Sequence, residues 1–205
     1  MYVANVHGLP EKPIKGTRPR SKDDALDAKM KDELLKSRKD DAELTMIVDL
    51  ERNDLGRVCD FGSVNVVERK ILESYSTVHH LVSTVEGDLR RQFDLVDLIK
   101  AVFPGGSITG APKIRAMEII DELEVHKRSV YAGCVGYFSA TGEMDSCIVL
   151  RTAIVKDGEM HVQAGAGIVA DSVPQSEFDE CVNKAKALFS ARAEALRFAG
   201  IKRNN

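Results

Sequence analysis

The alternation of apolar and polar residues along the chain predicts helices and short strands in mixed order. Apolar residues recur at helical spacing over residues 21–35, 40–55, 94–102, 112–123 and 174–200. Runs rich in β-branched residues predict strands over residues 2–6, 64–67 and 77–85. Turn sequences at residues 141–142 and 157–158 predict two hairpins. Because helices are mixed with antiparallel hairpins, we expect an α+β fold rather than a doubly wound sheet.

Capping residues mark where several of these helices begin and end. Ser21, with Asp24 three residues later, predicts the N-terminus of the first helix. Gly56 is expected just beyond the C-terminus of the second helix, and Pro112 suits the first position of the fourth. The residues expected to face the core are Leu26, Met30, Leu34 and Leu35 in the first helix and Met117, Ile120 and Leu123 in the fourth.

Composition and charge mainly indicate which kinds of partner and location are disfavoured. The 205 residues are 43% hydrophobic, which is enough for a substantial core, so we expect one domain over residues 1–205. The net charge is −3 and no basic stripe is present, which disfavours nucleic acid and membrane partners. The four cysteines form no C-x-x-C pair, and the chain has neither an 18-residue apolar run nor a leader. We therefore expect a cytoplasmic protein that binds small molecules or another protein.

Two glycine-rich segments have the spacing of nucleotide-binding loops but lack other required features. Residues 105–110 match a P-loop, yet the lysine comes late, at Lys113, with no Ser or Thr after it. Residues 165–170 match a dinucleotide fingerprint, but the apolar run is expected to continue as a strand. The backbone N–H groups of both segments suit small anions such as carboxylates, although ordinary turns explain either segment taken alone.

Two pairs of acidic residues have the spacing that places both members on one helix face. Asp40 and Glu43 form one pair, and Glu177 and Glu180 form the other. If the two faces meet, their oxygens suit Mg²⁺, which keeps several waters and takes one or two carboxylates directly. A solvated helix face is the alternative, because Glu180 and Lys184 also have the spacing of a surface ion pair.

Lys15 lies in the run Pro13-Ile14-Lys15-Gly16-Thr17, where a stiff backbone can aim its amine at a ligand. A surface lysine in a turn is the alternative. The run resembles a motif of the chorismate-utilising enzymes, in the aminodeoxychorismate synthase component I branch. The anthranilate synthase branch typically carries alanine at the position of Lys15.

The resemblance to chorismate-utilising enzymes continues through nearly the whole chain in the same order. The further matching segments are residues 40–57, 80–83, 103–113, 136–137, 150–152, 165–172 and 177–184. It implies a two-sheet sandwich rich in antiparallel strands, with helices outside, and magnesium-dependent chemistry on chorismate. It also implies that an N-terminal part is missing, because the family's serine-proline-glutamate motif would fall upstream of Met1.

The same resemblance assigns roles to individual residues. Glu43 and Glu180 would ligate Mg²⁺ directly, and Asp40 and Glu177 would hold its waters. Lys15 would be the nucleophile that attacks the ring before ammonia displaces it. The substrate would be held by Ser107, Tyr137, Arg151, Gly165, Ala166, Gly167 and Lys184.

His80 would act beside the substrate ring, although a hydrogen-bonded core histidine is the alternative, as for its neighbour His79. These roles predict amination of chorismate to 4-amino-4-deoxychorismate in folate biosynthesis, with ammonia from a glutamine amidotransferase partner. Two alternatives stay open. One is an anthranilate synthase component I, and the other is a chorismate-binding remnant without catalytic activity.

Overall fold

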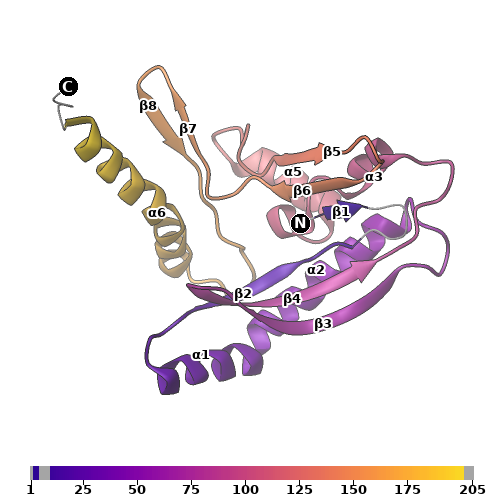
Figure 1. Ribbon diagram of the computed structural model, residues 1–205, viewed down its shortest axis with the longest axis horizontal. Helices are drawn as coiled ribbons and strands as arrows, with labels where there is room; N and C mark the ends of the chain where they lie inside the picture. The colour runs from indigo at the N-terminus through magenta and orange to yellow at the C-terminus, as the bar shows by residue number, and fades with distance from the viewer. Residues whose placement is uncertain (1, 5–9, 201–205) are drawn as a thin grey trace. The chain divides into compact units, whose positions relative to one another are not determined.

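The computed structural model describes residues 2–4 and 10–200 (Figure 1). The chain divides into two compact units. The first unit comprises Met1–Val125 and Cys134–Ile148, and the second comprises His126–Gly133 and Val149–Asn205. The expectation of one domain over the whole chain stays a prediction.

All strands of the first unit pair in antiparallel fashion. One sheet has the order β2-β4-β3 and the other has the order β1-β6-β5. Their bounds are β1 Tyr2–Ala4, β2 Ile14–Pro19, β3 Asn65–Ser74, β4 Val78–Glu86, β5 Cys134–Phe138 and β6 Met144–Ile148. The hairpin of β5 and β6 turns at the predicted position. Helices combined with antiparallel sheets confirm the predicted α+β class.

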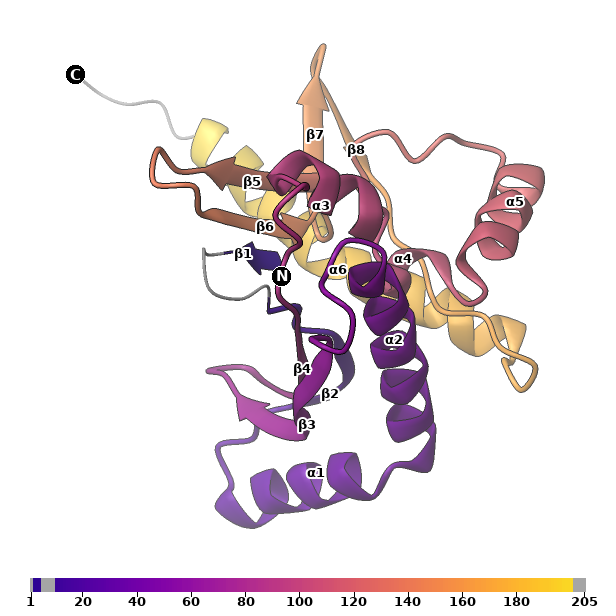
Figure 2. The ribbon, with the colours of Figure 1, turned by 90° about the vertical axis from the view of Figure 1, so that its right-hand side faces the viewer.

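The helices of the first unit bury one side against its central sheet. Their bounds are α1 Asp24–Lys36, α2 Arg38–Gly56, α3 Leu95–Val102, α4 Gly106–Thr109 and α5 Lys113–Leu123. Both α1 and α2 contact β2 and β4, and Figures 1 and 2 show α2 running along this sheet. The core between them includes Leu34, Leu44, Val48, Leu81 and Val85. Burial of these side chains is the main force that holds α2 on the sheet.

The structure corrects two predicted helix boundaries. Helix α1 is capped by Asp23, whose carboxylate accepts from the N–H of Leu26 at 2.9 Å, and not by Ser21. Helix α2 begins earlier than predicted because the Ser37 side chain accepts from the N–H of Asp40 at 3.2 Å. Gly56 is the last residue of α2 rather than the residue beyond it.

The length of β3 and the exposure of several helix residues also differ from the prediction. Strand β3 continues to Ser74, well past the predicted residues 64–67, because β4 pairs with it along its length. Helix α5 contains no buried residue, and its Met117 and Leu123 are exposed instead of facing a core. In α1, Leu34 is buried whereas Leu26 and Leu35 are exposed.

The second unit combines one hairpin with the long C-terminal helix. Strands β7, Ala153–Lys156, and β8, Glu159–Val162, turn at the predicted Asp157 and Gly158. Helix α6 spans Pro174–Gly200, as predicted. The expected strand over residues 165–170 is absent, since this apolar run has no regular structure. None of the described helices has the length and apolar character needed to cross a membrane.

Candidate active site

Lys15 lies at a corner between β2 and α2 in the first unit. Its Nζ is 2.9 Å from Oε2 of Glu43, and the two side chains are 28% and 17% exposed. The pairing register of β2 with β4 shifts between Ile14 and Thr17, and Gly16 has φ +86°. A Cβ on Gly16 would lie 2.9 Å from Cδ1 of Leu34, so glycine lets β2 approach the helices closely.

Asp40 and His80 extend this corner. Arg18 donates from NH2 to Oδ2 of Asp40 at 3.1 Å. Thr17, opposite His80 in the sheet, places its Oγ1 2.9 Å from Nδ1 of His80. The corner therefore brings together three of the predicted residues, Lys15, Asp40 and Glu43, with His80 on the adjacent strand. Arg18 was not predicted, and its spacing from Lys15 gave no signal, because residues three apart in a regular strand face opposite sides and the register of β2 shifts between Ile14 and Thr17.

His79 and His80 have different environments. His79 is fully buried, with Ser74 Oγ 2.8 Å from Nδ1 and Asp27 Oδ1 3.0 Å from Nε2. It is the hydrogen-bonded core histidine that was the alternative for this pair. His80 is partly exposed, and the ring of Tyr75 lies edge-on at 5.8 Å. Of the two, His80 is the histidine with a ring nitrogen available to a substrate.

Ser107 and Tyr137 also lie in the first unit, on other elements. Ser107 is exposed in α4, which packs closely on α2 because a Cβ on Gly106 would overlap the side chain of Leu50. Tyr137 is on β5 and is 61% exposed. The structure places both side chains at the surface of the unit, but it connects neither to the corner around Lys15 by a hydrogen bond.

Four of the predicted residues come together in the second unit. Lys184 on α6 donates from Nζ to the carbonyl oxygen of Gly165 at 2.9 Å, and the same nitrogen is 2.5 Å from Oε1 of Glu180. Arg151 donates from NH1 to the backbone oxygen of Lys184 at 2.8 Å. Lys184 thus contacts the glycine-rich segment that also contains Ala166 and Gly167, and Arg151 binds the backbone of Lys184.

Two residues with hydroxyl groups, Ser172 and Tyr131, also lie close to this network, and the sequence analysis had assigned neither of them a role. Ser172 donates to Oε1 of Glu177 at 2.8 Å and accepts from the N–H of Val169 at 3.0 Å. A Cβ on Gly165 would lie 2.9 Å from the hydroxyl of Tyr131, so this hydroxyl lies close to the backbone of the glycine-rich segment. Ser172 ends a matched segment, which was a signal for it. No comparable signal pointed to Tyr131.

The first unit also buries a group of carboxylates that was not predicted. Burial, reinforced by the negative charge of Asp54, raises the pKa of Glu51 to about 8. Burial and the charges of Glu51 and Asp54 raise the pKa of Glu11 well above its usual range. Both oxygens of Glu11 and Oε2 of Glu51 lack a hydrogen-bond partner among the described residues. Asp54 is paired with Lys113, which also donates to the backbone oxygen of Val102 at 3.1 Å.

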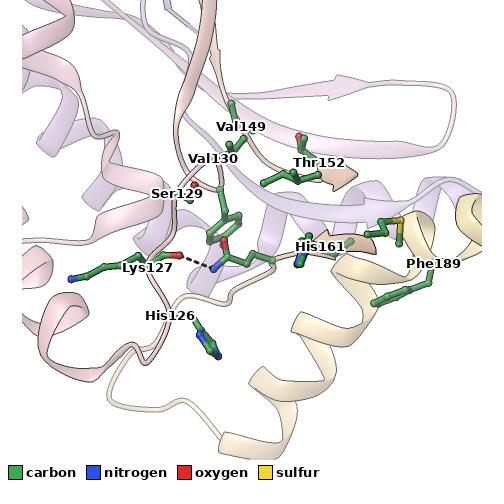
Figure 3. Close-up of a pocket in the computed structure, with 13 residues that line it drawn as sticks. His126, Lys127, Ser129, Val130, Val149, Thr152, His161 and Phe189 are labelled. Carbon is green, nitrogen blue, oxygen red and sulfur yellow. Dashed lines mark hydrogen bonds between the residues drawn. The ribbon is translucent and has the colours of Figure 1, made fainter. Parts of the chain in front are cut away.

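An open cavity of about 590 Å³ lies in the second unit (Figure 3). Val130, Val149 and Phe189 line it with other apolar side chains, and Gln163 donates to the backbone oxygen of Lys127 at 3.4 Å on its wall. No residue predicted to bind substrate or metal lines this cavity. Its lining also includes Lys127, His126 and His161, but because none of the predicted residues reaches it, we do not assign the substrate to this cavity.

The four predicted metal ligands have the donor chemistry that Mg²⁺ prefers, since all are carboxylates. The ammonium groups of Lys15 and Lys184 lie against Glu43 and Glu180, so both carboxylates already hold a cation. Among the described residues, however, no three His, Cys, Asp or Glu side chains are grouped closely enough to hold a metal. The magnesium site stays a prediction.

Comparison with known proteins identifies the family. A sequence profile described as chorismate binding enzyme matches residues 9–190. The chain belongs to the chorismate binding enzyme family. This match confirms the predicted family of chorismate-utilising enzymes, whereas it does not specifically support the aminodeoxychorismate synthase branch.

The relatives of this chorismate-binding chain include several named anthranilate synthase component 1. The one from Pseudomonas putida is 53% identical over 184 residues, which are 90% of this chain and 37% of the relative. The solved anthranilate synthase component I from Streptococcus pneumoniae TIGR4 is 44% identical, with a TM-score of 0.81 over 90% of this chain and 40% of the other. The chain thus spans well under half the length of these proteins.

The fold is also shared with another kind of enzyme. A putative 2,3-dihydroxybenzoate-specific isochorismate synthase from Bacillus anthracis is 27% identical, with a TM-score of 0.81 over 94% of this chain and 51% of the other. The resemblance of the fold therefore does not by itself separate the reactions of the family.

Proposed function

We propose that this chain carries chorismate-binding and catalytic residues of an anthranilate synthase component I. The main support is the 53% identity to proteins that bear this name. The geometry that fits it best is a pair of linked basic residues: Arg151 donates to the backbone oxygen of Lys184 at 2.8 Å, and Lys184 donates to the carbonyl oxygen of Gly165 at 2.9 Å. Chorismate is a dicarboxylate, and such a ligand needs two cationic anchors.

Each anchor keeps donors for a ligand. The guanidinium of Arg151 has five N–H donors, and the bond to the Lys184 carbonyl uses one of them. Its planar fork can then donate to a carboxylate bidentately. The role of Tyr137 as a further donor is implied by the family resemblance. Lys184 would face the second carboxylate beside the backbone N–H groups of Ala166 and Gly167.

The reaction that we propose adds ammonia to the ring of chorismate and expels its hydroxyl as water. Loss of the enolpyruvyl group as pyruvate, together with a ring proton, then gives anthranilate. His80 is the candidate to move that proton, because Thr17 binds its Nδ1 and leaves Nε2 for the substrate. The family resemblance implies that the carboxylates of Glu43, Glu180, Asp40 and Glu177 would hold Mg²⁺, which would supply positive charge for a substrate carboxylate.

Ammonia would come from a glutamine amidotransferase partner, and we place the complex in the cytoplasm. These two statements rest on the family resemblance alone. The whole activity is a proposal for a longer assembly, because the chain covers 37% of the Pseudomonas putida protein.

A second candidate is amination without loss of pyruvate, which gives 4-amino-4-deoxychorismate. It is favoured by Lys15, the residue that the aminodeoxychorismate synthase motif uses as nucleophile. In the structure, however, the Nζ of Lys15 is paired with Oε2 of Glu43 at 2.9 Å, so it is not directed freely at a ligand. We therefore rank this reaction second.

Binding and product formation test the proposal separately. By isothermal titration with Mg²⁺ present, we expect Arg151→Met to weaken chorismate binding at least about tenfold, through loss of a charge-assisted bond. With ammonium salt, fluorescence should report anthranilate, and a coupled assay should report pyruvate. Equal affinity in Arg151→Met would refute the binding geometry, whereas an aminated product without pyruvate would favour the second candidate.

A further inference from the structure

The open cavity of the second unit is not used by the proposed reaction, although its walls have a defined chemical character. They come from residues 126–131, from residues 149–152, from the β7–β8 hairpin with Gln163, and from α6 (Figure 3). All of these segments belong to the second unit. The volume of about 590 Å³ lies within the range of small-molecule sites, so a ligand is a reasonable occupant.

Apolar side chains from every one of these segments line the cavity. They are Val130, Val149, Ile154, Met160, Val162 and Phe189. The ring of Phe189 on α6 is 55% exposed, so a ligand that packs on it would remove apolar surface from water. Because aromatic rings stack on one another and on aliphatic groups, this wall suits a flat ring system.

The charged and titratable side chains of the wall are basic. His126, Lys127 and His161 line the cavity, and none of the described residues that line it is an aspartate or a glutamate. Glu159 lies 3.7 Å from Nε2 of His161, but both side chains are mostly exposed, so this pair is weak. Figure 3 shows the side chain of Lys127 extending away from the other labelled side chains. The imidazole N–H groups of His126 and His161 are therefore the candidate donors to an anion.

The combination of an apolar wall with basic side chains selects the class of ligand. One carboxylate can accept from an imidazole N–H, whereas a second one would lie against apolar side chains and lose its hydration without a partner. We propose that this cavity binds a planar aromatic monocarboxylate. The site is separate from the proposed chorismate anchors, since neither Arg151 nor Lys184 lines it.

Tyr131 connects the cavity to the proposed chorismate anchors. It lines the cavity, and a Cβ on Gly165 would lie 2.9 Å from its hydroxyl. The carbonyl oxygen of Gly165 in turn accepts from Lys184 at 2.9 Å. A ligand that moves Tyr131 therefore shifts Gly165 and Lys184, and we expect it to change the affinity for chorismate. This consequence, unlike the site itself, rests on the proposed function.

Fluorescence titration with 2-naphthoate provides the first test. The unmutated chain should bind 2-naphthoate about tenfold more tightly than 2-naphthamide, which has the same ring system but no charge. Phe189→Ala should weaken the binding of 2-naphthoate about fivefold through loss of a ring contact. Phe178→Ala is the matched control and should change it less than about twofold, because Phe178 is also exposed on α6 but does not line the cavity.

Two results of these titrations would contradict the proposal. Equal affinity for 2-naphthoate and 2-naphthamide would show that the cavity does not recognise a carboxylate. An equal loss of affinity in Phe189→Ala and Phe178→Ala, or no saturable binding to the unmutated chain, would show that the cavity is not the site.

Methionine-methyl NMR of the unmutated protein provides a second test that does not depend on a variant of Phe189. Addition of 2-naphthoate should shift the methyl signal of Met160, which lines the cavity. The methyl signal of Met117, which is exposed on α5, is the control and should stay in place. Met160→Leu and Met117→Leu identify the two signals. Shifts of equal size at both methionines, or at neither, would overturn the proposal.

Titration of chorismate with and without saturating 2-naphthoate separates this inference from the proposed function. A change in chorismate affinity of at least about twofold that is absent in Phe189→Ala would support the connection through Tyr131, and an unchanged affinity would refute that connection. If chorismate does not bind at all, the proposed function fails, while the naphthoate titrations and the Met160 signal still decide the cavity. If the two ligands exclude each other completely, the cavity is not a separate site and the inference is wrong.

Discussion

Replacement of Glu51 by glutamine should stabilise the first unit, and most strongly at alkaline pH. The Glu51 side chain is only 6% exposed, and its Oε2 has no hydrogen-bond partner among the described residues. Burial and the nearby charge of Asp54 raise its pKa to about 8. Glutamine has nearly the same shape but cannot ionise, so it removes the cost of a buried charge while the packing stays intact.

The pKa of Glu51 gives the sign and an upper limit of this effect. In the unfolded chain Glu51 ionises near 4.5, and in the folded chain near 8. The native state therefore holds the extra proton between these values, and stability falls as the pH rises from 4.5 to about 8. At about 1.4 kcal/mol per pH unit, the loss is at most about 5 kcal/mol. Because the interior relaxes around a charge, we expect Glu51→Gln to gain about 2 kcal/mol at pH 8.5.

Urea denaturation followed by circular dichroism at about pH 5 and about pH 8.5 provides the measurement. Glu51→Gln should differ little from the unmutated protein at the lower pH and should be more stable at the higher pH. Glu122→Gln, at an exposed position on α5, is the control. Its stability relative to the unmutated protein should be the same at both pH values. If the unmutated protein is as stable at pH 8.5 as at pH 5, or if Glu51→Gln loses stability at both, Glu51 is not the buried acid described here.

Three further changes test other parts of the structure. Asp27→Asn should lower the melting temperature near neutral pH. Hydrogen bonds from the Ser21 backbone, His79 and Arg20 outweigh the effect of burial and hold the pKa of Asp27 well below 3.8. In thermal melts, the difference between variant and unmutated protein should therefore disappear as the pH falls. Gly136→Ala should cost about 2–3 kcal/mol in urea denaturation, because a Cβ there overlaps the carbonyl of Asp145, whereas Gly56→Ala should change stability by less than about 1 kcal/mol. Lys184→Met should weaken chorismate binding about tenfold in calorimetry, and equal weakening in exposed Lys186→Met would contradict the role of Lys184.

Local patterns predicted the elements whose signals lie within a short stretch of chain. Both C-terminal hairpins turn at the predicted glycines, and α6 has the predicted bounds. The length of β3 was not predictable, because its charged middle becomes strand only through pairing with β4. The run at residues 165–170 failed in the opposite way, since apolar character alone does not make a strand without a pairing partner.

The candidate site shows the same division. The acidic pairs lie on their predicted helices, and Arg151, Gly165, Glu180 and Lys184 form the network described above. The pairing of Lys15 with Glu43 was not predicted, because it depends on how closely β2 approaches α2. The burial of Glu11 was missed for a related reason, since it depends on tertiary packing. Glu51 did have a signal, because it lies four residues after Ile47 and four before Leu55 on the core-facing stripe of α2.

The positive φ of Gly16 makes the distance between Lys15 and Glu43 a steric quantity as well as an electrostatic one. Alanine at this position would strain the backbone and press against Leu34 and Asp40. The strand would then move outward and carry the ammonium of Lys15 away from the helix, although every charged residue is retained. A mutation with no change in charge could thus have the same effect as loss of a salt bridge. The ion pair of Lys15 with Glu43 therefore depends on the absence of a methyl group at position 16.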